Sequence, residues 1–214
     1  MIHRVLSSTR VATLSVLLLG LAVGCANNPH QAEIAELQGL RDSLEAAKAD
    51  LAQLPADTLT ATLTWATDEF RNFEVMMRDS GMVLTKDEGL IVAEVSRARR
   101  LLKDFPERRT RIGEAIDRAL NQTAGLAQLL AEQQATDGAG NTVDSAYIAD
   151  NLRLELRIGR DLCASVAETA DYAERGQATA EAVREQADSL ATVLRARLAQ
   201  LVLARANDSE TAPR

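Results

Sequence analysis

The strongest cluster of chemically useful side chains is a basic segment in an otherwise acidic protein. Residues 97–111 carry seven cations and two acids, a local charge of +5 in a chain whose net charge is −7. The cations are Arg97, Arg99, Arg100, Lys103, Arg108, Arg109 and Arg111. If one helix runs through the segment, a subset falls on one face, because each residue turns a helix by about 100°. That subset is Arg97, Arg100, Arg108, Arg111 and, further on, Arg118. Guanidinium groups gathered in this way can bind an anionic partner: a phosphorylated lipid, a cell-wall polymer or an acidic protein surface.

The same arginines also have a purely structural interpretation. Acids lie at helical neighbour spacings, as in Glu94–Arg97 and Glu107–Arg111, and each such pair stabilises a helix by about 0.2–0.5 kcal/mol. The segment could also pair with an acidic helix such as the one that carries Asp161, Glu168, Asp171 and Glu174. Salt-bridged faces are common on exposed helices, so the composition favours this interpretation and leaves partner binding as the alternative.

A second candidate surface holds most of the bulky side chains. Trp65, Phe70 and Phe73 recur at helical spacing together with Met76 and Met77. Such a stripe usually belongs to a core, but it can also form a partner groove or an apolar ligand cavity. Trp65, Phe70 and Phe73 are therefore candidate partner-binding residues, beside Arg97, Arg100, Arg108 and Arg111.

No residue pattern indicates catalysis, a cofactor or a metal site. The only histidine after residue 24 is His30, which argues against histidine-based triads and against the Glu-x-x-His motifs of di-iron bundles. Zinc, calcium and phosphate-loop motifs are absent from the sequence. An enzyme that uses carboxylates alone would need a water-shielded acidic pair, and no pair stands out. The acidic balance also argues against general nucleic-acid binding.

Cys25 is the residue with the clearest expected modification. It follows a basic start, an apolar core at 11–21 and small residues at 22–24, which is the pattern of a secretory signal. The polar residues 26–29 come too soon for a membrane-spanning helix, which needs about 20 apolar residues. The alternative is an ordinary cleaved signal followed by a chance cysteine.

The tract LAVGC at 21–25 resembles the lipobox of bacterial lipoproteins, with Ala22 where leucine is usual. The resemblance covers only the first 25 residues. It implies that Cys25 becomes the mature N-terminus and carries diacylglycerol and palmitate chains, which together give stable membrane anchoring. It also implies the periplasmic face of the outer membrane, because Ala26 stands where an inner-membrane lipoprotein has aspartate.

The expected organisation is a cleaved signal peptide at 1–24, a lipidated cysteine and polar tether at 25–32, a helical bundle at 33–206 and a disordered tail at 207–214. The low aromatic fraction of 3% and the many Ala, Leu, Glu and Arg residues are typical of long helices. Cys163, the one thiol left after acylation, is expected to be a small buried hydrophobe rather than a reactive or dimer-forming group.

Apolar heptads predict an all-α, antiparallel up-and-down bundle with coiled-coil-like packing and an elongated shape. The expected helices are 34–54, 57–79, 86–134, 143–175 and 178–206. Residues 58–65 alternate like a strand, but the longer spacing favours a helix. Thr85 and Glu88 match a capping box. We favour one helix bent at Pro106, and the alternative is a restart with Asp104 as N-cap. Gly176 is expected to end a helix in the left-handed conformation.

These features predict a lipid-anchored periplasmic protein of the outer membrane that acts as a non-enzymatic structural or adaptor bundle. Its expected contacts are the membrane through the lipid, an envelope protein or anionic cell-wall polymer, and a second copy of the chain. The alternative function is a lipid-anchored ligand-binding bundle with an apolar cavity around Trp65.

Overall fold

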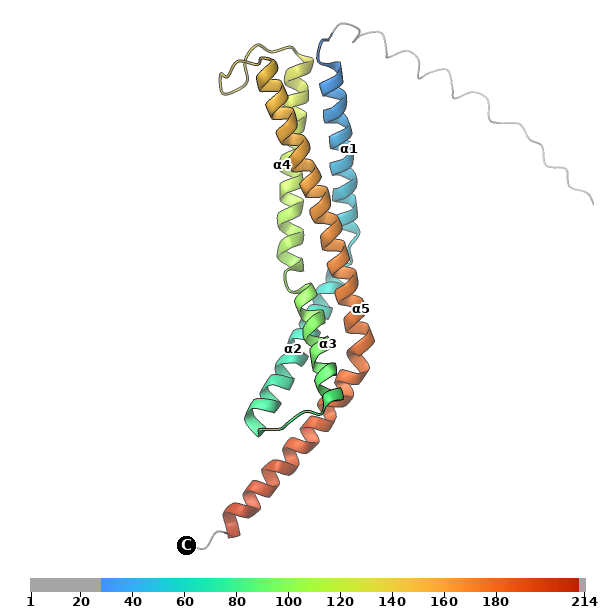
Figure 1. Cartoon of the computed structure of the whole chain (residues 1–214), viewed down its shortest axis with the longest axis vertical. Coiled ribbons are helices and arrows are strands. Elements are labelled where there is room, and N and C mark those ends of the chain that lie inside the picture. Colours follow the sequence, from blue (N-terminus) through green and yellow to red (C-terminus); the bar gives the residue numbers. More distant parts are fainter. Residues whose placement is uncertain (1–27, 212–214) are drawn as a thin grey trace, which may run out of the picture.

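Within residues 28–211, which the computed structural model describes, five helices form an elongated rod (Figure 1). They are α1 (Gln31–Gln53), α2 (Ala56–Ser80), α3 (Lys86–Leu102), α4 (Phe105–Ala131) and α5 (Ser145–Thr211). The only extended pairing in this part of the chain is one isolated bridge between Thr136 and Thr142. The all-α prediction is confirmed, and the threonine-rich segment 58–65 lies inside α2.

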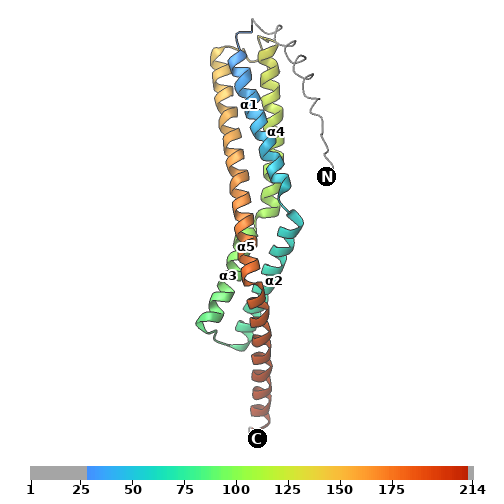
Figure 2. The same ribbon diagram turned by 90° about the vertical axis from the view of Figure 1, so that its right-hand side faces the viewer.

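The chain follows the rod three times (Figures 1 and 2). α1 and α2 lead away from Asn28, α3 and α4 return, and α5 runs the full length with its 67 residues, about 100 Å at 1.5 Å per residue. We call the end where α1 and α5 begin the tether end, and the end that holds residues 81–85 the far end. The antiparallel bundle therefore consists of three long passes, two of which are interrupted.

Each half of the rod has its own three-helix core around α5. In the tether half α5 packs with α1 and α4, and in the far half it packs with α2 and α3. The heptad of α1 buries the predicted residues Leu37, Leu40, Leu44, Ala47 and Leu51. The far half is built on small and branched side chains such as Ala66, Val95, Ala98, Ala180 and Val183 around Phe73.

The two interrupted passes break at the same level of the rod, which we call the junction. Leu59, Leu102, Phe105 and Ala173 form one buried cluster there, and Leu54 and Ala56 pack against it. The cluster therefore joins residues beside the α1–α2 break to residues beside the α3–α4 break and to the uninterrupted α5. Phe105 is nearly fully buried, so it anchors the first turn of α4 in this cluster.

The favoured single helix over 86–134 is wrong, because α3 ends at Leu102 and α4 begins at Phe105. Pro106 has no amide to donate to the carbonyl of Leu102, so the ladder is interrupted at this point. The alternative restart is correct in position: Asp104 occupies the N-cap position and Pro106 lies in the first turn. The side chain of Asp104 makes no capping hydrogen bond.

The expected helix end at Gly176 is also wrong, because α5 continues through it without interruption. Gly176 is buried, and a Cβ at this position would lie 2.6 Å from both Cγ and Cδ2 of Leu102. The glycine therefore allows α5 to approach the end of α3 closely. Helical glycine normally weakens a helix by roughly 1 kcal/mol relative to alanine, and the close packing explains why it is present here.

The turns follow local rules that the sequence made visible. Gly81 ends α2 in the left-handed region with φ of 68°. The Thr85 hydroxyl accepts from the Glu88 amide while the Glu88 carboxylate accepts from the Thr85 amide, so the predicted capping box is present. In the α4–α5 loop, hydrogen bonds from the side chain and backbone of Asn141 to Asp137 hold the pKa of that carboxyl at about 2.

The chain ends differ from the expected boundaries. α1 begins at Gln31, inside the predicted tether, and α5 extends to Thr211, so it continues into the segment 207–214 that we expected to be disordered. The signal peptide and Cys25 lie outside the described residues. In the described part of the chain, no helix combines the length and hydropathy needed to cross a bilayer.

Candidate functional site

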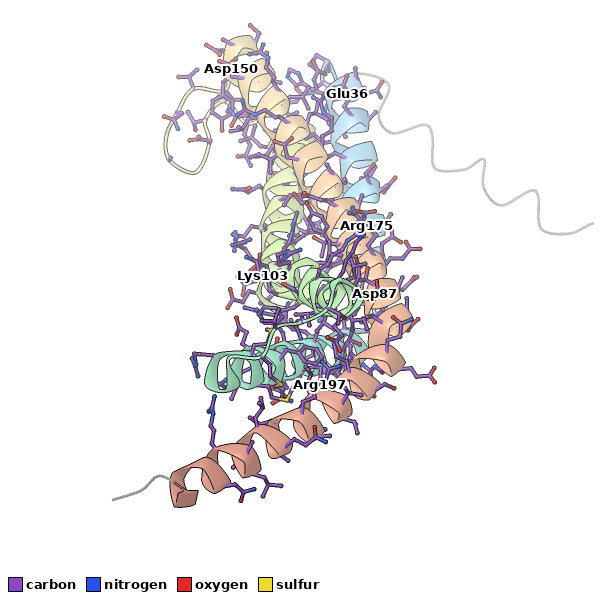
Figure 3. The ribbon with its side chains drawn as sticks, turned by 60° about the horizontal axis from the view of Figure 1, so that its bottom comes forward. Glu36, Asp87, Lys103, Asp150, Arg175 and Arg197 are labelled. Carbon is purple, nitrogen blue, oxygen red and sulfur yellow. The ribbon has the colours of Figure 1, made fainter. Side chains whose placement is uncertain are left out.

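Three of the four candidate arginines come together in one groove at the junction. The groove has a volume of about 400 Å³ and lies between the α3–α4 break and α5. Its lining residues are Arg97, Arg100, Leu101, Asp104, Phe105, Arg108, Thr169 and Tyr172. Figure 3 shows Lys103 at this break and Arg175 on the neighbouring stretch of α5. We call this site the junction groove.

Arg108 is held in place by two groups on α5. Its guanidinium forms an ion pair with the Glu168 carboxylate, and the guanidinium carbon lies 5.4 Å from the centre of the Tyr172 ring. Only 22% of the Arg108 side chain is exposed. This pairing between helices supports the intrabundle interpretation for Arg108, and it also fixes the orientation of one cation at the groove.

Arg97 and Arg100 lie on α3 and are exposed. The contacts of Arg97 and Arg100 are with residues one helical turn earlier. Arg97 Nη1 is 3.7 Å from Glu94 Oε2, and Arg100 Nη1 donates a 3.0 Å hydrogen bond to the neutral hydroxyl of Ser96. The ion pair of Arg97 is long and solvent-exposed, which makes it weak. These two guanidinium groups therefore bring positive charge to the open side of the groove.

The N-terminus of α4 also reaches the groove through Asp104 and Phe105. The Asp104 side chain does not cap the helix, and its Oδ2 lies 4.0 Å from Lys103 Nζ. The first-turn amides of a helix have no intrahelical partner and carry a partial positive charge. Asp104 places one negative charge at the same site, so the groove combines three arginines and a helix N-terminus with one opposing carboxylate.

The remaining cations of the segment do not line this groove. Arg111 is exposed on α4. Arg109 Nε donates to the carbonyl of Leu51 at 3.4 Å, which links α4 to α1. The guanidinium carbon of Arg99 lies 5.0 Å from the centre of the Phe70 ring. The expected stripe is therefore not one continuous helix face: its first two members lie on α3 and the other three on α4, and the first three of the five line the groove across the break.

The candidate aromatic residues belong mainly to the core of the far half. Phe73 is fully buried, so it cannot contact a partner in this conformation. Trp65 and Phe70 are half-buried against the same cluster. The Arg184 guanidinium carbon lies 4.5 Å from the centre of the Trp65 ring. An arginine therefore stacks on each of the two rings, Arg184 on Trp65 and Arg99 on Phe70.

Cys163 is half-buried in a shallow groove of about 540 Å³ between α1 and α5. Its Sγ lies 3.8 Å from the carbonyl oxygen of Ser43, and burial raises the pKa of the thiol. A raised pKa lowers the thiolate fraction, and the thiolate is the reactive form. The surroundings are therefore those of a packed structural cysteine, although the side chain is less buried than expected.

Two buried carboxylates were not singled out by sequence reasoning. Glu69 on α2 and Glu155 on α5 are each only 8% exposed, and each has one buried oxygen without a hydrogen-bond partner. Burial raises the pKa of Glu155. They lie in different halves of the rod and do not form the water-shielded pair that a carboxylate enzyme would need. Within the described residues, no group of three or more His, Cys, Asp and Glu side chains is placed to hold a metal ion.

A further surface was missed because its residues look like core residues in the sequence. Seven of the eight exposed large apolar side chains in the described chain lie towards the far end. They are Val75, Val83, Leu90, Val193, Leu201, Val202 and Leu203, and we call them the far-end patch. Leu201 continues the heptad of Leu190, Leu194 and Leu198. The first turn of α3, which begins at Lys86, lies beside Arg197 through the Glu88–Arg197 ion pair. α3 therefore does not extend far enough along α5 to cover Leu201.

Comparison with known proteins identifies no relative of this chain. No protein-family model matches it, and neither the curated proteins nor the solved structures include a match.

Proposed function

We propose that this protein is a lipid-anchored, periplasmic adaptor of the outer membrane that binds a partner protein at its far end and has no enzymatic activity. The main support for the proposal is that the two ends of the rod differ in character. Asn28, the first described residue, lies at one end of the rod, and most of the exposed large apolar side chains of the described chain lie towards the other end.

The tether end holds the entering chain close to the bundle. The Asn28 side-chain amide donates to the carbonyl oxygens of Leu130 and Ala131 at 3.1 and 3.3 Å, at the end of α4. The Asn28 side-chain oxygen accepts a 2.8 Å hydrogen bond from the His30 amide. A lipid on Cys25 would be three residues from this contact. The anchor would then lie at the tether end, and α5, about 100 Å long along its own axis, would lead away from it to the far end.

The far-end patch supports partner binding because it includes three consecutive exposed apolar residues of α5, Leu201, Val202 and Leu203, and clustered exposed apolar side chains often mark a binding site. The apolar face of α5 that packs on α2 and α3 continues past them into Leu201 and Val202. A partner that presents an amphipathic helix could extend this core by the same packing. Such a partner would be held at a set distance from the membrane, which is a task for a rigid helical rod.

Two experiments in cells test the two parts of the proposal. Cys25→Ser should release the chain from the membrane pellet, and retention of this variant in the pellet would contradict lipid anchoring. A photo-crosslinking amino acid at Leu201 should give a discrete protein adduct. The same probe at Leu154, which is 40% exposed in the tether half, serves as the matched control. Equal adducts at both positions, or none at Leu201, would contradict a far-end partner site.

A further inference from the structure

We infer that the junction groove binds an organic phosphate, meaning a phosphate group carried on a small apolar body. This inference is independent of the proposed lipid anchor and of the far-end patch. It depends on the meeting of Arg97, Arg100 and Arg108 from two helices, on the start of α4 and on the apolar walls between them.

The charge at the groove favours an entering anion. The lining side chains are three arginines and one aspartate, which leaves +2. Their ion-pair partners are Lys103, Glu94 and Glu168, and the balance is still +1 when all three are included. Arg100 is the cation most ready for a ligand, since its hydrogen bond goes to the neutral Ser96 hydroxyl. A phosphate monoester carries about −1.5 to −2 at neutral pH, so it gains more from this charge than a carboxylate does.

The number and arrangement of the guanidinium groups favour a phosphate over a carboxylate ligand. One arginine fork already satisfies both oxygens of a carboxylate, whereas a phosphate group offers further oxygens to additional forks. Here three guanidinium groups line one groove together with the first turn of α4. The N-terminus of a helix is a favourable position for phosphate because its free amides and its dipole act together, although Pro106 contributes no amide to the first turn of α4. Asp104 leaves this position open because its side chain makes no capping hydrogen bond.

The walls of the groove explain why the ligand should carry an apolar body. Leu101, Phe105 and Tyr172 line it beside the arginines. Its volume of about 400 Å³ is much larger than a phosphate group requires. Arg108 is already fixed between Glu168 and the Tyr172 ring, so little ordering of that side chain remains on binding. The groove therefore provides a charged end and an apolar end for one small molecule.

Substitution of Asp104 should change the affinity for phosphate in the opposite direction to substitution of the arginines. Asp104 is the one acid that lines the groove, so it must repel a bound phosphate. Asp104→Asn should tighten binding by up to about fivefold, because an exposed charge contributes up to roughly 1 kcal/mol. Arg100→Gln and Arg97→Gln should each weaken binding by about tenfold, the usual effect of a lost charge-assisted contact. Neither effect is expected if the cluster serves only to hold the helices together.

The test is calorimetric titration of the full chain in detergent with phenyl phosphate at low ionic strength. Benzoate serves as the carboxylate analogue of the same body. Arg118→Gln is the matched variant, since Arg118 lies on α4, is exposed and does not line the groove. Circular dichroism checks that each variant is folded. Soluble dihexanoyl phosphatidic acid then separates a lipid headgroup from a soluble organic phosphate as the source of the group, and inorganic phosphate tests whether the apolar body contributes to binding.

The expected result is saturable one-to-one binding of phenyl phosphate, with benzoate at least about tenfold weaker. Tighter binding of dihexanoyl phosphatidic acid than of phenyl phosphate would assign the site to a lipid headgroup, and the reverse order to a soluble organic phosphate. Tighter binding of inorganic phosphate than of both would overturn the inference, because the apolar body would then contribute nothing. Absence of saturable binding by wild type overturns the inference. Equal affinities for benzoate and phenyl phosphate, or equal losses in Arg118→Gln and Arg100→Gln, also overturn it.

Discussion

Gly176 of α5 lies directly against Leu102, the last residue of α3, at the level where both interrupted passes of the rod break. Leu102 is completely buried, and Leu101 is also close, at 3.2 Å from the position of a Cβ on residue 176. The neighbouring side chains therefore have little room to move. The absence of a side chain at residue 176 therefore allows α5 to approach the end of α3 this closely.

Gly176→Ala should destabilise the protein although alanine is the better helix former. The added methyl group would overlap Leu102, and overpacking a core typically costs about 1–3 kcal/mol. Urea unfolding followed by circular dichroism measures the change. Gly125→Ala is the matched control, because Gly125 is exposed in α4 with open space at its Cβ, and it should stabilise by up to about 1 kcal/mol. A stabilised Gly176→Ala variant would contradict this prediction, because it would mean that Leu102 moves aside for the methyl group at little cost.

The ion pair between Glu88 and Arg197 should stabilise the far half of the rod above acidic pH. The two groups are 2.7 Å apart, and the Arg197 guanidinium, followed by the Thr85 amide, lowers the pKa of Glu88 below its ordinary 4.5. A lowered folded-state pKa adds stability that is present above 4.5 and is lost as the pH falls through the folded value. Glu88→Gln should therefore lower the melting temperature at pH 7. The difference from wild type should disappear at the acid end of a pH series, and a constant difference would contradict this origin.

Glu155 should have the opposite pH dependence. Burial raises its pKa, so the folded state holds a proton more tightly than the unfolded chain does. The buried charge therefore destabilises the fold, the opposite of the effect of Glu88. This destabilisation is fully present above the folded-state pKa and is relieved as the pH falls from that pKa to the ordinary 4.5. Glu155→Leu removes a buried carboxylate with an unpartnered oxygen and should raise the melting temperature at pH 7. The gain should shrink towards pH 4, and a gain that does not depend on pH would assign the effect to packing instead.

Cys163 should react slowly with thiol reagents in the folded protein. Burial raises its pKa, and the side chain is packed between α1 and α5. The rate of modification by a chromogenic disulfide should rise steeply in denaturing urea. If Cys25 is acylated as proposed, the mature chain should yield one titratable thiol under denaturing conditions. Two thiols in mature protein would contradict the acylation, and rapid modification of the native protein would contradict the packed environment.

Features of the rod that depend on near neighbours in the chain were predictable from the sequence. The heptad of α1 buries the expected leucines, and Thr85, Glu88 and Gly81 form the expected cap and turn. The threonine-rich start of α2 was correctly assigned because its apolar spacing over several turns outweighs local strand preference. In each case the interacting groups are within a few residues of one another, so periodicity and capping rules are sufficient.

The junction, by contrast, was decided by tertiary packing. Pro106 is compatible with either a bent helix or a new one, and the burial of Phe105 beside Leu59 and Ala173 accompanies the new helix. From the sequence alone, Gly176 suggested a helix end because glycine readily adopts the left-handed conformation found there. Its function in the fold is to leave space for Leu102, a residue from another helix.

The candidate sites divide in the same way. The order of residues was enough to predict which side chains carry charge, which faces are apolar and where processing at Cys25 is expected. Tertiary packing brought Arg97 and Arg100 of α3 together with Arg108 of α4 at one groove across the break at Lys103 and Asp104, whereas Arg111, on the same helix as Arg108, does not line it. Only the tertiary structure left Leu201 exposed, because a heptad records an apolar face but not the length of the helices that cover it.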